Sequence, residues 1–309
     1  MNKDTVKKMK RALARWAYHL FMFIFWVTPY PIIKAISNGL IAFAYRILRR
    51  MRKVAMETLT IAFGHEKSRE ELEKICKDCF YNAGKCAIEM GAFTTRPKMI
   101  LDNFRFDGDS QQNLENALKE GNGVMAVSAH FGNFPLMLLY LAQRGYPTNA
   151  IIRPARDEAI EKHFQDARDR LKLKTVHSYP REACVRQSLK ALRAKELLVV
   201  LLDQNTGSKS GVYVDFFGKK AGTSTGPIVF ALRTGSPILP IFAVRDGEDS
   251  HKIIIEPHFY LEKKATDEET LQASVQQITN IIERYIRMYP KEWAWMHRRF
   301  KSKQGEEHA

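Results

Sequence analysis

Residues 123–135 read GVMAVSAHFGNFP, an apolar run that gives way to a histidine, a glycine and an asparagine. Residues 123–129 have the continuous apolar character of a strand that is buried on both faces of a sheet. The apolar residues 134–144 follow as a helical stretch, and Pro135 is compatible with a first helical turn. The stretch therefore predicts a buried strand, a short turn and a helix, with His130 at the carboxyl end of the strand.

The same alternation continues outward from this stretch. Apolar runs with strand character occupy residues 149–152, 197–202, 238–244 and 252–255. Helical stretches are predicted at residues 66–94, 134–144, 158–173, 182–194, 226–234 and 268–288. Strands that alternate with helices indicate an α/β fold, a central sheet flanked by helices. A length of 309 residues favours one large domain with an appendage.

Three polar side chains directly follow predicted strands: His130, Arg153 and Asp203. Ligands of open α/β sheets gather at the carboxyl ends of strands, so we predict His130 as a general base and Arg153 as a binder of phosphate or carboxylate. Asp203 leaves a buried strand and needs a cation or a hydrogen-bond donor nearby. A purely structural His130 and an ion pair between Arg153 and Asp203 are the alternatives.

Smaller residues accompany these candidates. Gly132 permits a close backbone approach, and Asn133 is predicted to cap the following helix. Residues 211–226 are rich in Gly, Thr and Ser towards their end, which predicts a loop before a helix whose N-terminus can bind an anion. The spacing is not that of a P-loop, so no nucleotide site is predicted. Helix capping by Ser224 or Thr225 is the alternative for this loop.

The four cysteines are Cys76, Cys79, Cys86 and Cys184. The first three are separated by three and seven residues, which places them on one face of the predicted helix 66–94. Because no second ligand pair with zinc spacing follows, we predict buried apolar thiols and no metal site. So few cysteines suit a reducing compartment.

Charge points to an acidic partner. The chain has 49 Lys and Arg against 34 Asp and Glu, a net charge of +15. Such an excess suits nucleic acid, an anionic lipid surface or an acidic protein. Aromatic and basic residues interleave in residues 293–300, WAWMHRRF. No nucleic-acid-binding motif surrounds them, so we predict that this segment docks onto the sheet domain or the membrane interface, and predict no nucleic-acid partner.

The N-terminus combines basic clusters with short apolar runs. Apolar residues 16–27 follow a basic start, and a second apolar stretch, 32–48, leads into the basic residues 46–53. Neither run has the ~20 apolar residues of a spanning helix. The pattern predicts a hairpin or surface helix on an anionic membrane. A spanning segment is one alternative, and a cleaved signal peptide is disfavoured because small residues are missing after the apolar core.

Seven pieces of sequence, in their order along the chain, carry a resemblance. They are SAHFGNFP (128–135), IIRP (151–154), LLDQN (201–205), GVYVDFFG (211–218), AGTSTGP (221–227), TGSPILP (234–240) and WAWMHRRFK (293–301). Together they resemble the lipid A biosynthesis acyltransferase family of the lysophospholipid-acyltransferase-like group. Single pieces are weak signals, but the ordered set spans essentially the whole chain.

The resemblance implies a mixed central sheet flanked by helices, as in glycerolipid acyltransferases, with an N-terminal membrane-associated helical segment. It divides the chain into an anchor (1–55), an acyltransferase domain (56–300) and a polar tail (301–309). The implied reaction moves a fatty acyl group from acyl-carrier protein or CoA to a hydroxyl of a lipid A precursor or related glycolipid. The implied place is the cytoplasmic face of the inner membrane, without metal or cofactor.

The resemblance also implies roles for particular residues. The catalytic set is His130, Arg153 and Asp203. The substrate-binding set is Gly132, Asn133, Gln204, Phe217, Gly218 and Thr223. Acyl-carrier protein is acidic, so the basic surface has two expected partners, the donor protein and an anionic membrane surface.

One position departs from the family pattern. The family places Asp or Glu five residues after the catalytic histidine, where this chain has Pro135. The chain is then an acyltransferase whose carboxylate comes from elsewhere, with Asp203 as the leading candidate, or one that uses His130 with a backbone carbonyl and Arg153. The third interpretation is an impaired member that binds lipid or acyl-carrier protein.

Overall fold

A computed structural model describes residues 3–155, 157–206 and 211–301. Its centre is a seven-stranded sheet with the strand order β1-β9-β8-β2-β5-β3-β4. The strands are β1 (Phe104–Phe106), β2 (Val124–Ser128), β3 (Thr148–Ile152), β4 (Lys174–His177), β5 (Leu197–Leu201), β8 (Ile238–Arg245) and β9 (His251–Ile255). All neighbours run parallel except β8 and β9, which are antiparallel. The sheet is therefore mixed, as predicted.

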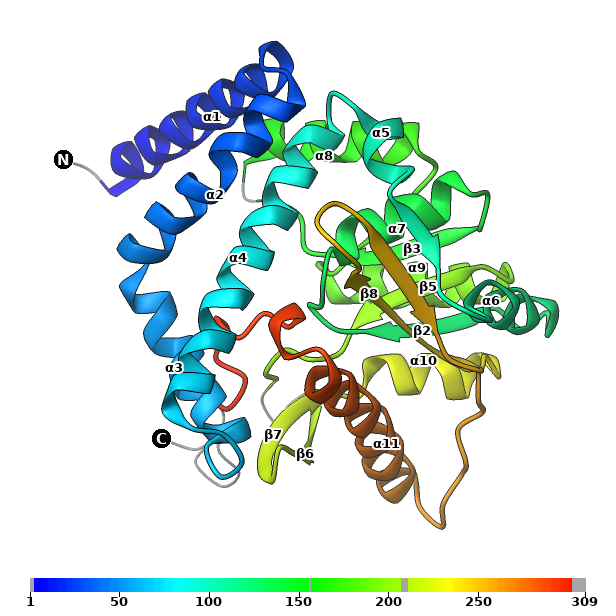
Figure 1. Ribbon diagram of the computed structural model, residues 1–309. Coiled ribbons are helices and arrows are strands. Elements are labelled where there is room, and N and C mark those ends of the chain that lie inside the picture. The colour runs from blue at the N-terminus through cyan, green and yellow to red at the C-terminus, as the bar shows by residue number, and fades with distance from the viewer. Residues whose placement is uncertain (1–2, 156, 207–210, 302–309) are drawn as a thin grey trace.

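Helices surround the sheet (Figure 1). They are α1 (Lys3–Val27), α2 (Tyr30–Ile47), α3 (Arg49–Phe63), α4 (Arg69–Phe93), α5 (Pro97–Leu101), α6 (Ser110–Lys119), α7 (Phe134–Gln143), α8 (Glu158–Arg170), α9 (Arg181–Arg193), α10 (Gly226–Thr234), α11 (Asp267–Met288) and the 3-10 turn η2 (Pro290–Glu292). In the ribbon view α2 and α3 lie on the outer side of α4, and α1 lies at the top of the molecule beside α8.

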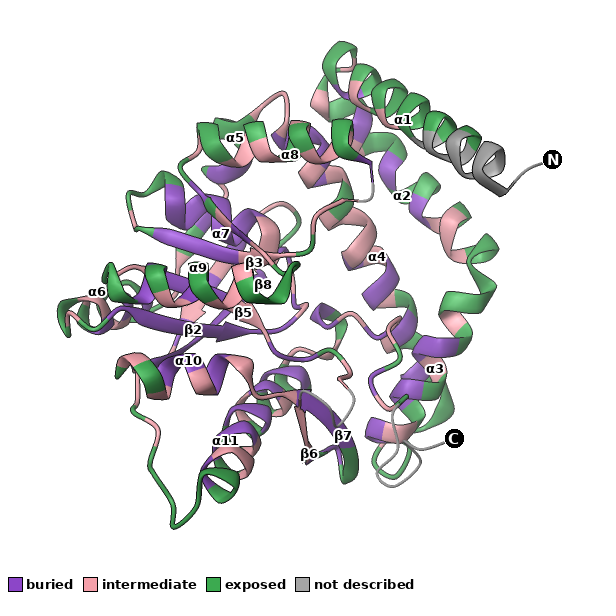
Figure 2. Cartoon of the chain, turned by 180° about the vertical axis from the view of Figure 1, so that it is seen from behind, coloured by how far each residue is buried: buried purple, intermediate pink, exposed green. Residues whose placement is uncertain are grey.

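Strand β2 shows why both faces of the sheet are apolar. Side chains alternate between the two faces of a strand. Met125 and Val127 join the cluster formed with α3, α10 and α11, whereas Val124 and Ala126 join the cluster formed with α6 and α7. Every residue of β2 is buried, as the strands seen from behind also show (Figure 2). The continuous apolar run is therefore the signature of a strand covered on both sides.

The predicted elements agree with the structure to within a few residues, with one correction. Residues 211–226 were expected to form a loop before a helix, and this is wrong. They form an antiparallel hairpin of β6 (Gly211–Phe216) and β7 (Lys219–Ser224), and α10 begins only at Gly226. Phe217 and Gly218, at the tip, both have positive φ (51° and 70°), as a two-residue hairpin turn requires. Helices α3, α5 and α6 and the short strands β1 and β4 were not predicted.

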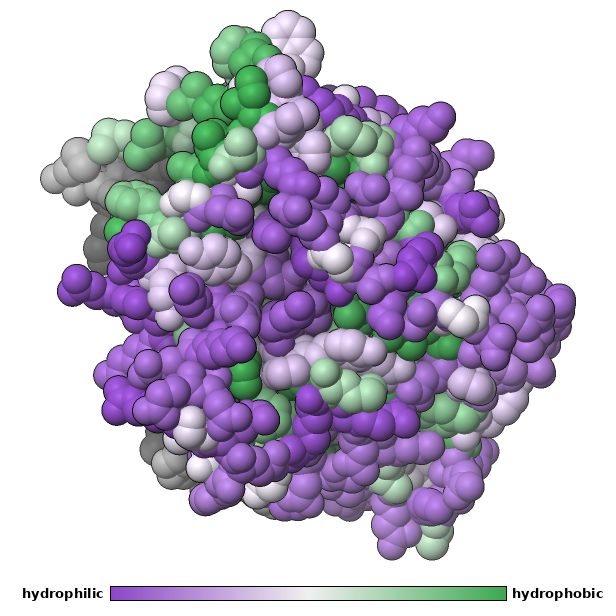
Figure 3. Space-filling model, in the orientation of Figure 1, coloured by the Kyte–Doolittle hydropathy of each residue, from purple (hydrophilic) through white to green (hydrophobic). Residues whose placement is uncertain are grey.

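The N-terminal helices expose much apolar surface. In the space-filling view the hydrophobic side chains gather over α1 and the start of α2, while most of the remaining visible face is hydrophilic (Figure 3). Within the described residues, no single helix is long and apolar enough to cross a membrane. The helices α2 and α3, which are bent by 81° relative to each other, together have the length and apolar composition of a span. The predicted anchor boundary at residue 55 falls inside α3, and residues 302–309 of the predicted tail lie outside the described residues.

Candidate active site

His130 and Asp203 meet because their strands are neighbours in register. Strands β2 and β5 are parallel, and Ser128 pairs with Leu201 at their carboxyl ends. The Leu202 amide donates to the Ser128 carbonyl (2.9 Å), which extends the register past the strand ends. Both candidates lie two residues beyond that pair. Sheet register thus brings together two residues that are 73 positions apart in the sequence.

The Asp203 carboxylate is buried and has three hydrogen-bond partners. Its Oδ1 lies 2.8 Å from His130 Nδ1, and its Oδ2 accepts from the His130 amide (3.0 Å) and from Trp293 Nε1 (2.7 Å). Burial alone would raise the pKa of this carboxyl. Hydrogen bonds from His130 and Trp293, together with the favourable electrostatic effects of His130 and His297, outweigh burial and lower the pKa to about 2. Asp203 is therefore ionised at neutral pH.

An ionised Asp203 fixes the tautomer of His130. A carboxylate can only accept, so the proton of the neutral imidazole must be on Nδ1, and Nε2 carries the lone pair. Gln204 Nε2 lies 3.0 Å from that nitrogen and donates to it. The His130 side chain is 28% exposed, so Nε2 is reachable from outside. The arrangement is that of an oriented general base whose lone pair is held by a displaceable amide.

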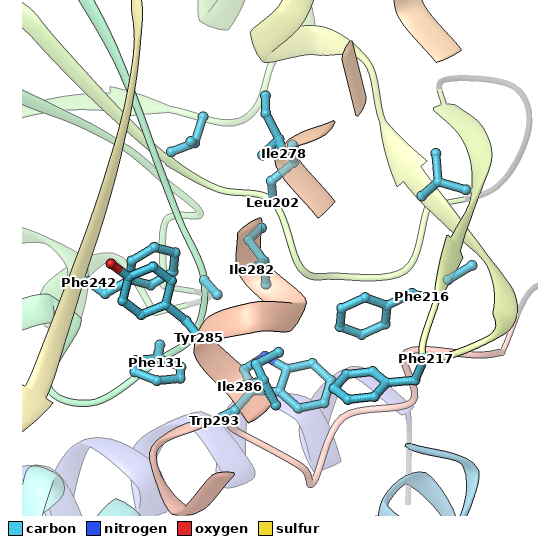
Figure 4. Packing of buried hydrophobic residues seen from close by; sticks show 14 of the residues in the cluster. Phe131, Leu202, Phe216, Phe217, Phe242, Ile278, Ile282, Tyr285, Ile286 and Trp293 are labelled. Atoms are coloured by element: carbon cyan, nitrogen blue, oxygen red, sulfur yellow. The ribbon is translucent and has the colours of Figure 1, made fainter. Parts of the chain in front are cut away.

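The C-terminal segment clamps this pair, as the predicted docking of residues 293–300 onto the sheet domain anticipated. The Ala294 amide donates to the His130 carbonyl (3.0 Å), and Trp293 forms an isolated bridge with Phe131. Trp293 is fully buried and packs edge-on against Phe216 (Figure 4). Its indole N–H to Asp203 is a contact that sequence reasoning missed, because no spacing rule joins residues 90 positions apart.

Arg299 supports the same loop from the opposite side. It is 1% exposed and donates to the carbonyls of Gln204 (3.2 Å) and Gly222 (2.6 Å) and to the Thr223 hydroxyl (2.5 Å). Burial lowers its pKa to about 10. Thr223 was predicted as a substrate-binding residue of an open loop. It is instead fully buried in β7 and holds Arg299.

Arg153 follows β3, the strand beside β5, and so lies at the same edge of the sheet. Its side chain is exposed. The alternative of an Arg153–Asp203 ion pair is wrong, because Asp203 binds His130 and Trp293, and no ion pair involving Arg153 is found among the residues that the structure describes. Arg153 is therefore available to a ligand anion.

Gly132 and Asn133 lie behind His130. Gly132 has φ +53°, and a Cβ at this position would come within 2.0 Å of the Ala243 carbonyl oxygen, so only glycine fits. Asn133 precedes α7, but the predicted side-chain cap is wrong, because its amide donates to Glu89 Oε2 (2.7 Å) instead. Glu89 also binds Arg245 through both carboxylate oxygens (2.6 and 3.1 Å).

Two cavities adjoin the site. The smaller, about 250 Å³, is bounded by His130, Gly132 and Asn133 on one side and by α4 and Glu292 on the other. The larger, about 550 Å³, is almost entirely apolar and lies between α1, α4, α7, α8 and the ends of β3 and β5. Ala87, Met90, Phe134 and Pro135 line both cavities. The histidine therefore lies beside an apolar chamber of the size that ligand pockets have, about 300–1,000 Å³.

Other predicted binding residues do not line the cavity beside His130. Phe217 is buried against Phe63 and Trp295, and Gly218 is exposed at the tip of the β6–β7 hairpin. Gln204 contacts the opposite side of the imidazole, where its side-chain nitrogen lies 3.0 Å from His130 Nε2. Of the predicted substrate-binding residues, Gly132 and Asn133 line the cavity, and Gln204 touches the base.

The cysteines are free thiols, as predicted. Cys76 and Cys79 are buried in α4, and burial raises their pKa to about 11 and about 12. Thiols with raised pKa are poor nucleophiles at neutral pH. Among the residues described, no group of three His, Cys, Asp or Glu side chains is arranged to hold a metal ion.

Comparisons with known proteins show which family the chain resembles over its length. The family model described as bacterial lipid A biosynthesis acyltransferase matches residues 1–302. The chain is 28% identical over 283 residues to the lipid A biosynthesis palmitoleoyltransferase of Escherichia coli, covering 90% of this chain and 88% of that protein. It is 25% identical over 298 residues to the lipid A biosynthesis lauroyltransferase of the same organism (93% and 92% covered). A solved 1-acyl-sn-glycerophosphate acyltransferase from Thermotoga maritima has a TM-score of 0.38 and 16% identity, with 87% of this chain and 96% of that chain covered.

Proposed function

Because this chain belongs to the bacterial lipid A biosynthesis acyltransferase family, we propose that it transfers a fatty acyl group from a thioester to a hydroxyl of a lipid A precursor or a related glycolipid. The observation that carries the proposal is the contact between His130 Nδ1 and the buried, ionised Asp203 (2.8 Å). An imidazole held in this tautomer is equipped to deprotonate a hydroxyl.

The proposed reaction uses His130 twice. The acceptor hydroxyl displaces the Gln204 amide at Nε2 and gives its proton to that nitrogen while its oxygen attacks the thioester carbonyl carbon. The tetrahedral intermediate collapses, the carbon–sulfur bond breaks, and the imidazolium returns the proton to the departing sulfur. The products are an ester and a free thiol. Asp203 stays ionised throughout and stabilises the imidazolium between the two proton transfers.

The apolar cavity is the proposed site of the fatty acyl chain. Its walls come from Tyr18, Phe21 and Met22 on one side and from Leu138 and Leu139 on the other, with few polar atoms. Each methylene transferred from water into such a site contributes about 0.8 kcal/mol. Since the cavity shares Phe134 and Pro135 with the smaller cavity at His130, a chain lying in it would present its carbonyl carbon to the base.

Pro135 fits this assignment. At the position where the family has an acid, it forms part of the wall between the apolar cavity and the histidine. We assign the orienting role to Asp203, which follows β5. A carboxylate in this role supports an active enzyme. A catalytically impaired protein that binds lipid or acyl-carrier protein is the alternative, and it predicts no product in the experiment below.

Arg153 is the proposed anion-binding residue. It is exposed at the same sheet edge, and its planar guanidinium suits a phosphate of the acceptor or donor. The acyl donor is proposed to be acyl-carrier protein or CoA, used as a co-substrate with no resident cofactor. An acidic carrier protein would be attracted by the net charge of +15.

The exposed apolar side chains of α1 and α2 support attachment to the cytoplasmic face of the inner membrane. Trp16, Phe23 and Trp26 of α1, and Leu40 and Phe43 of α2, are all more than half exposed. Aromatic residues are favoured at the membrane–water interface, and the nearby basic residues 46–53 suit an anionic leaflet. The proposed anchor therefore lies on the membrane surface near the apolar cavity, to which α1 contributes a wall.

The test uses detergent-purified protein, radiolabelled acyl-carrier-protein or CoA thioesters and an inner-membrane lipid extract. Wild type should form an acylated glycolipid of altered chromatographic mobility, and His130→Ala should not. His65→Ala removes an exposed histidine outside the site and serves as the matched control. Absence of product from wild type with every donor, together with retained membrane binding, would overturn the proposal in favour of a binding protein.

A further inference from the structure

A second acidic side chain lies in the cavity beside His130. Glu292 ends the 3-10 turn η2, and its side chain lines the cavity of about 250 Å³. Its backbone carbonyl accepts from the Gly132 amide (2.8 Å), which ties it to the loop that carries His130. Only 4% of Glu292 is exposed. An acidic residue this buried stays ionised only where a cation or several hydrogen-bond donors compensate for its charge.

The two carboxyl oxygens of Glu292 differ. Oε2 accepts a hydrogen bond from Asn82 Nδ2 (2.8 Å), whereas Oε1 is buried without a partner among the described residues. The orientation of the Asn82 amide is fixed, because its oxygen accepts from Arg245 Nε (2.8 Å). Oε2 is therefore an acceptor. A proton on Glu292 would be on Oε1, the oxygen that lacks a partner.

Among the residues that the structure describes, no cation forms an ion pair with Glu292. Arg245 is the cation that acts on it most strongly, but its guanidinium is bound at both ends of the Glu89 carboxylate. The other charged or titratable groups that act on this region are Lys291 on the same turn, and Cys79 and Cys86 on α4. Burial is the largest influence and raises the pKa of Glu292, against smaller opposing effects of Arg245, Asn82 and Lys291.

We propose that Glu292 is a further catalytic residue, a neutral carboxylic acid whose Oε1–H donates a hydrogen bond to the carbonyl oxygen of the thioester. The inference rests on the proposed acyl transfer. An acyl chain in the apolar cavity enters past Ala87, Met90, Phe134 and Pro135, which line both cavities. Its carbonyl group then lies in the cavity that Glu292 and His130 share. A donor aimed at the oxygen on which charge develops lowers the barrier of the attack.

Asn133 also lines this cavity and has an unpartnered oxygen among the described residues, but that oxygen cannot donate a hydrogen bond to the thioester. Asn133 Oδ1 is buried without a partner among the described residues, but an amide oxygen can only accept, and the Asn133 amide nitrogen already donates to Glu89. An acceptor repels a developing oxyanion. The thiol of Cys79 is also committed, because it donates to the Trp293 carbonyl (3.0 Å). Glu292 lines the cavity and keeps one carboxyl oxygen, Oε1, without a partner among the described residues.

Two substitutions distinguish a hydrogen-bond donor from a negative charge at position 292. Glu292→Gln keeps an acceptor for Asn82 and offers an N–H at the position of Oε1, so it should retain most of kcat. Glu292→Leu keeps the volume but removes the donor, and should lower kcat by about 10²–10³ with little change in KM. Glu262→Gln, at an exposed site, is the matched control. Equal kcat for wild type and Glu292→Leu, or equal loss for the Gln and Leu variants, would overturn the inference.

Stability against pH provides a readout that does not depend on turnover. A carboxyl whose pKa is raised by folding stabilises the native state fully below its unfolded pKa, about 4.3, and this contribution is lost as pH rises through the folded pKa. The difference in melting temperature between wild type and Glu292→Gln (wild type minus variant) should therefore decrease as the pH rises from 4 to alkaline values. A difference that stays flat or rises would show an ionised Glu292 and overturn the inference. Absence of wild-type transfer would instead overturn the proposed function on which it rests.

Discussion

The Asp203→Asn substitution tests the central contact of the site, because the hydrogen bonds around Asp203 dictate how an asparagine must sit. Two N–H groups, from the His130 backbone and Trp293, point at Oδ2, so the amide oxygen has to stay there. The amide NH₂ then faces His130 Nδ1. Since NH₂ can only donate, the imidazole proton moves to Nε2, and the base loses the lone pair that it needs.

The magnitude has two parts. The first part is the loss of the negative charge, which the fold favours strongly enough to lower the pKa of Asp203 to about 2 despite its burial, so the imidazolium loses a stabilising partner. The change of tautomer adds to this. In the serine-protease triad the same acid-to-amide change lowers kcat by about 10⁴, and we expect about 10³–10⁴ here by analogy.

The assay compares turnover and lipid binding in the same preparations. Asp203→Asn should lose acyl transfer from the labelled thioester, while its binding to vesicles of anionic lipid changes little. Asp246→Asn makes the same chemical change at a surface ion pair with Arg105 and should leave both unchanged. Turnover within about tenfold of wild type, or turnover and binding lost in equal measure, would contradict an orienting role of Asp203 and mark it as a structural residue.

Three further predictions follow from the same contacts. Trp293→Phe removes the indole donor to Asp203 Oδ2, worth about 1.5–3 kcal/mol for a charged acceptor. The pKa of Asp203 should therefore rise in the variant. Wild type loses stability as the pH falls from about 4 to about 2, and the variant should lose less over the same range, as measured by unfolding midpoints. Ala167→Trp fills the apolar cavity and should shift donor preference towards shorter acyl chains in competition assays. Pro135→Glu places an acid in an apolar wall while Asp203 already holds Nδ1, and should lower kcat.

The sheet and the first contact of the site could be predicted because both depend on local patterns. Apolar runs identified β2 and β5, and the residues that follow parallel neighbouring strands must meet at one edge of the sheet. The β6–β7 hairpin was missed although Val212, Val214 and Phe216 alternate with more polar positions. The turn residue Phe217 has positive φ, which sequence statistics disfavour for an aromatic residue.

The rest of the site depends on contacts between distant segments, which composition and spacing do not encode. Trp293 reaches Asp203 and Glu292 reaches Gly132 only because the chain after α11 returns across the strand ends. Arg299 likewise had no predicted partner, yet it donates to the carbonyl of Gln204, the residue that follows Asp203. A basic and aromatic segment that could be taken for a nucleic-acid surface is instead the clamp that fixes the site.

The departure at Pro135 has a structural explanation that the motif alone conceals. A carboxylate at Nδ1 orients a histidine that acts as a base, but nothing requires that carboxylate to come from the same loop. Asp203 satisfies the geometry from β5 (2.8 Å) and is itself fixed by Trp293. Once Nδ1 is occupied, an acid five residues after His130 would have no place at the imidazole. Position 135 can therefore hold an apolar residue, and Pro135 lines the apolar cavity together with Phe134 and Leu138.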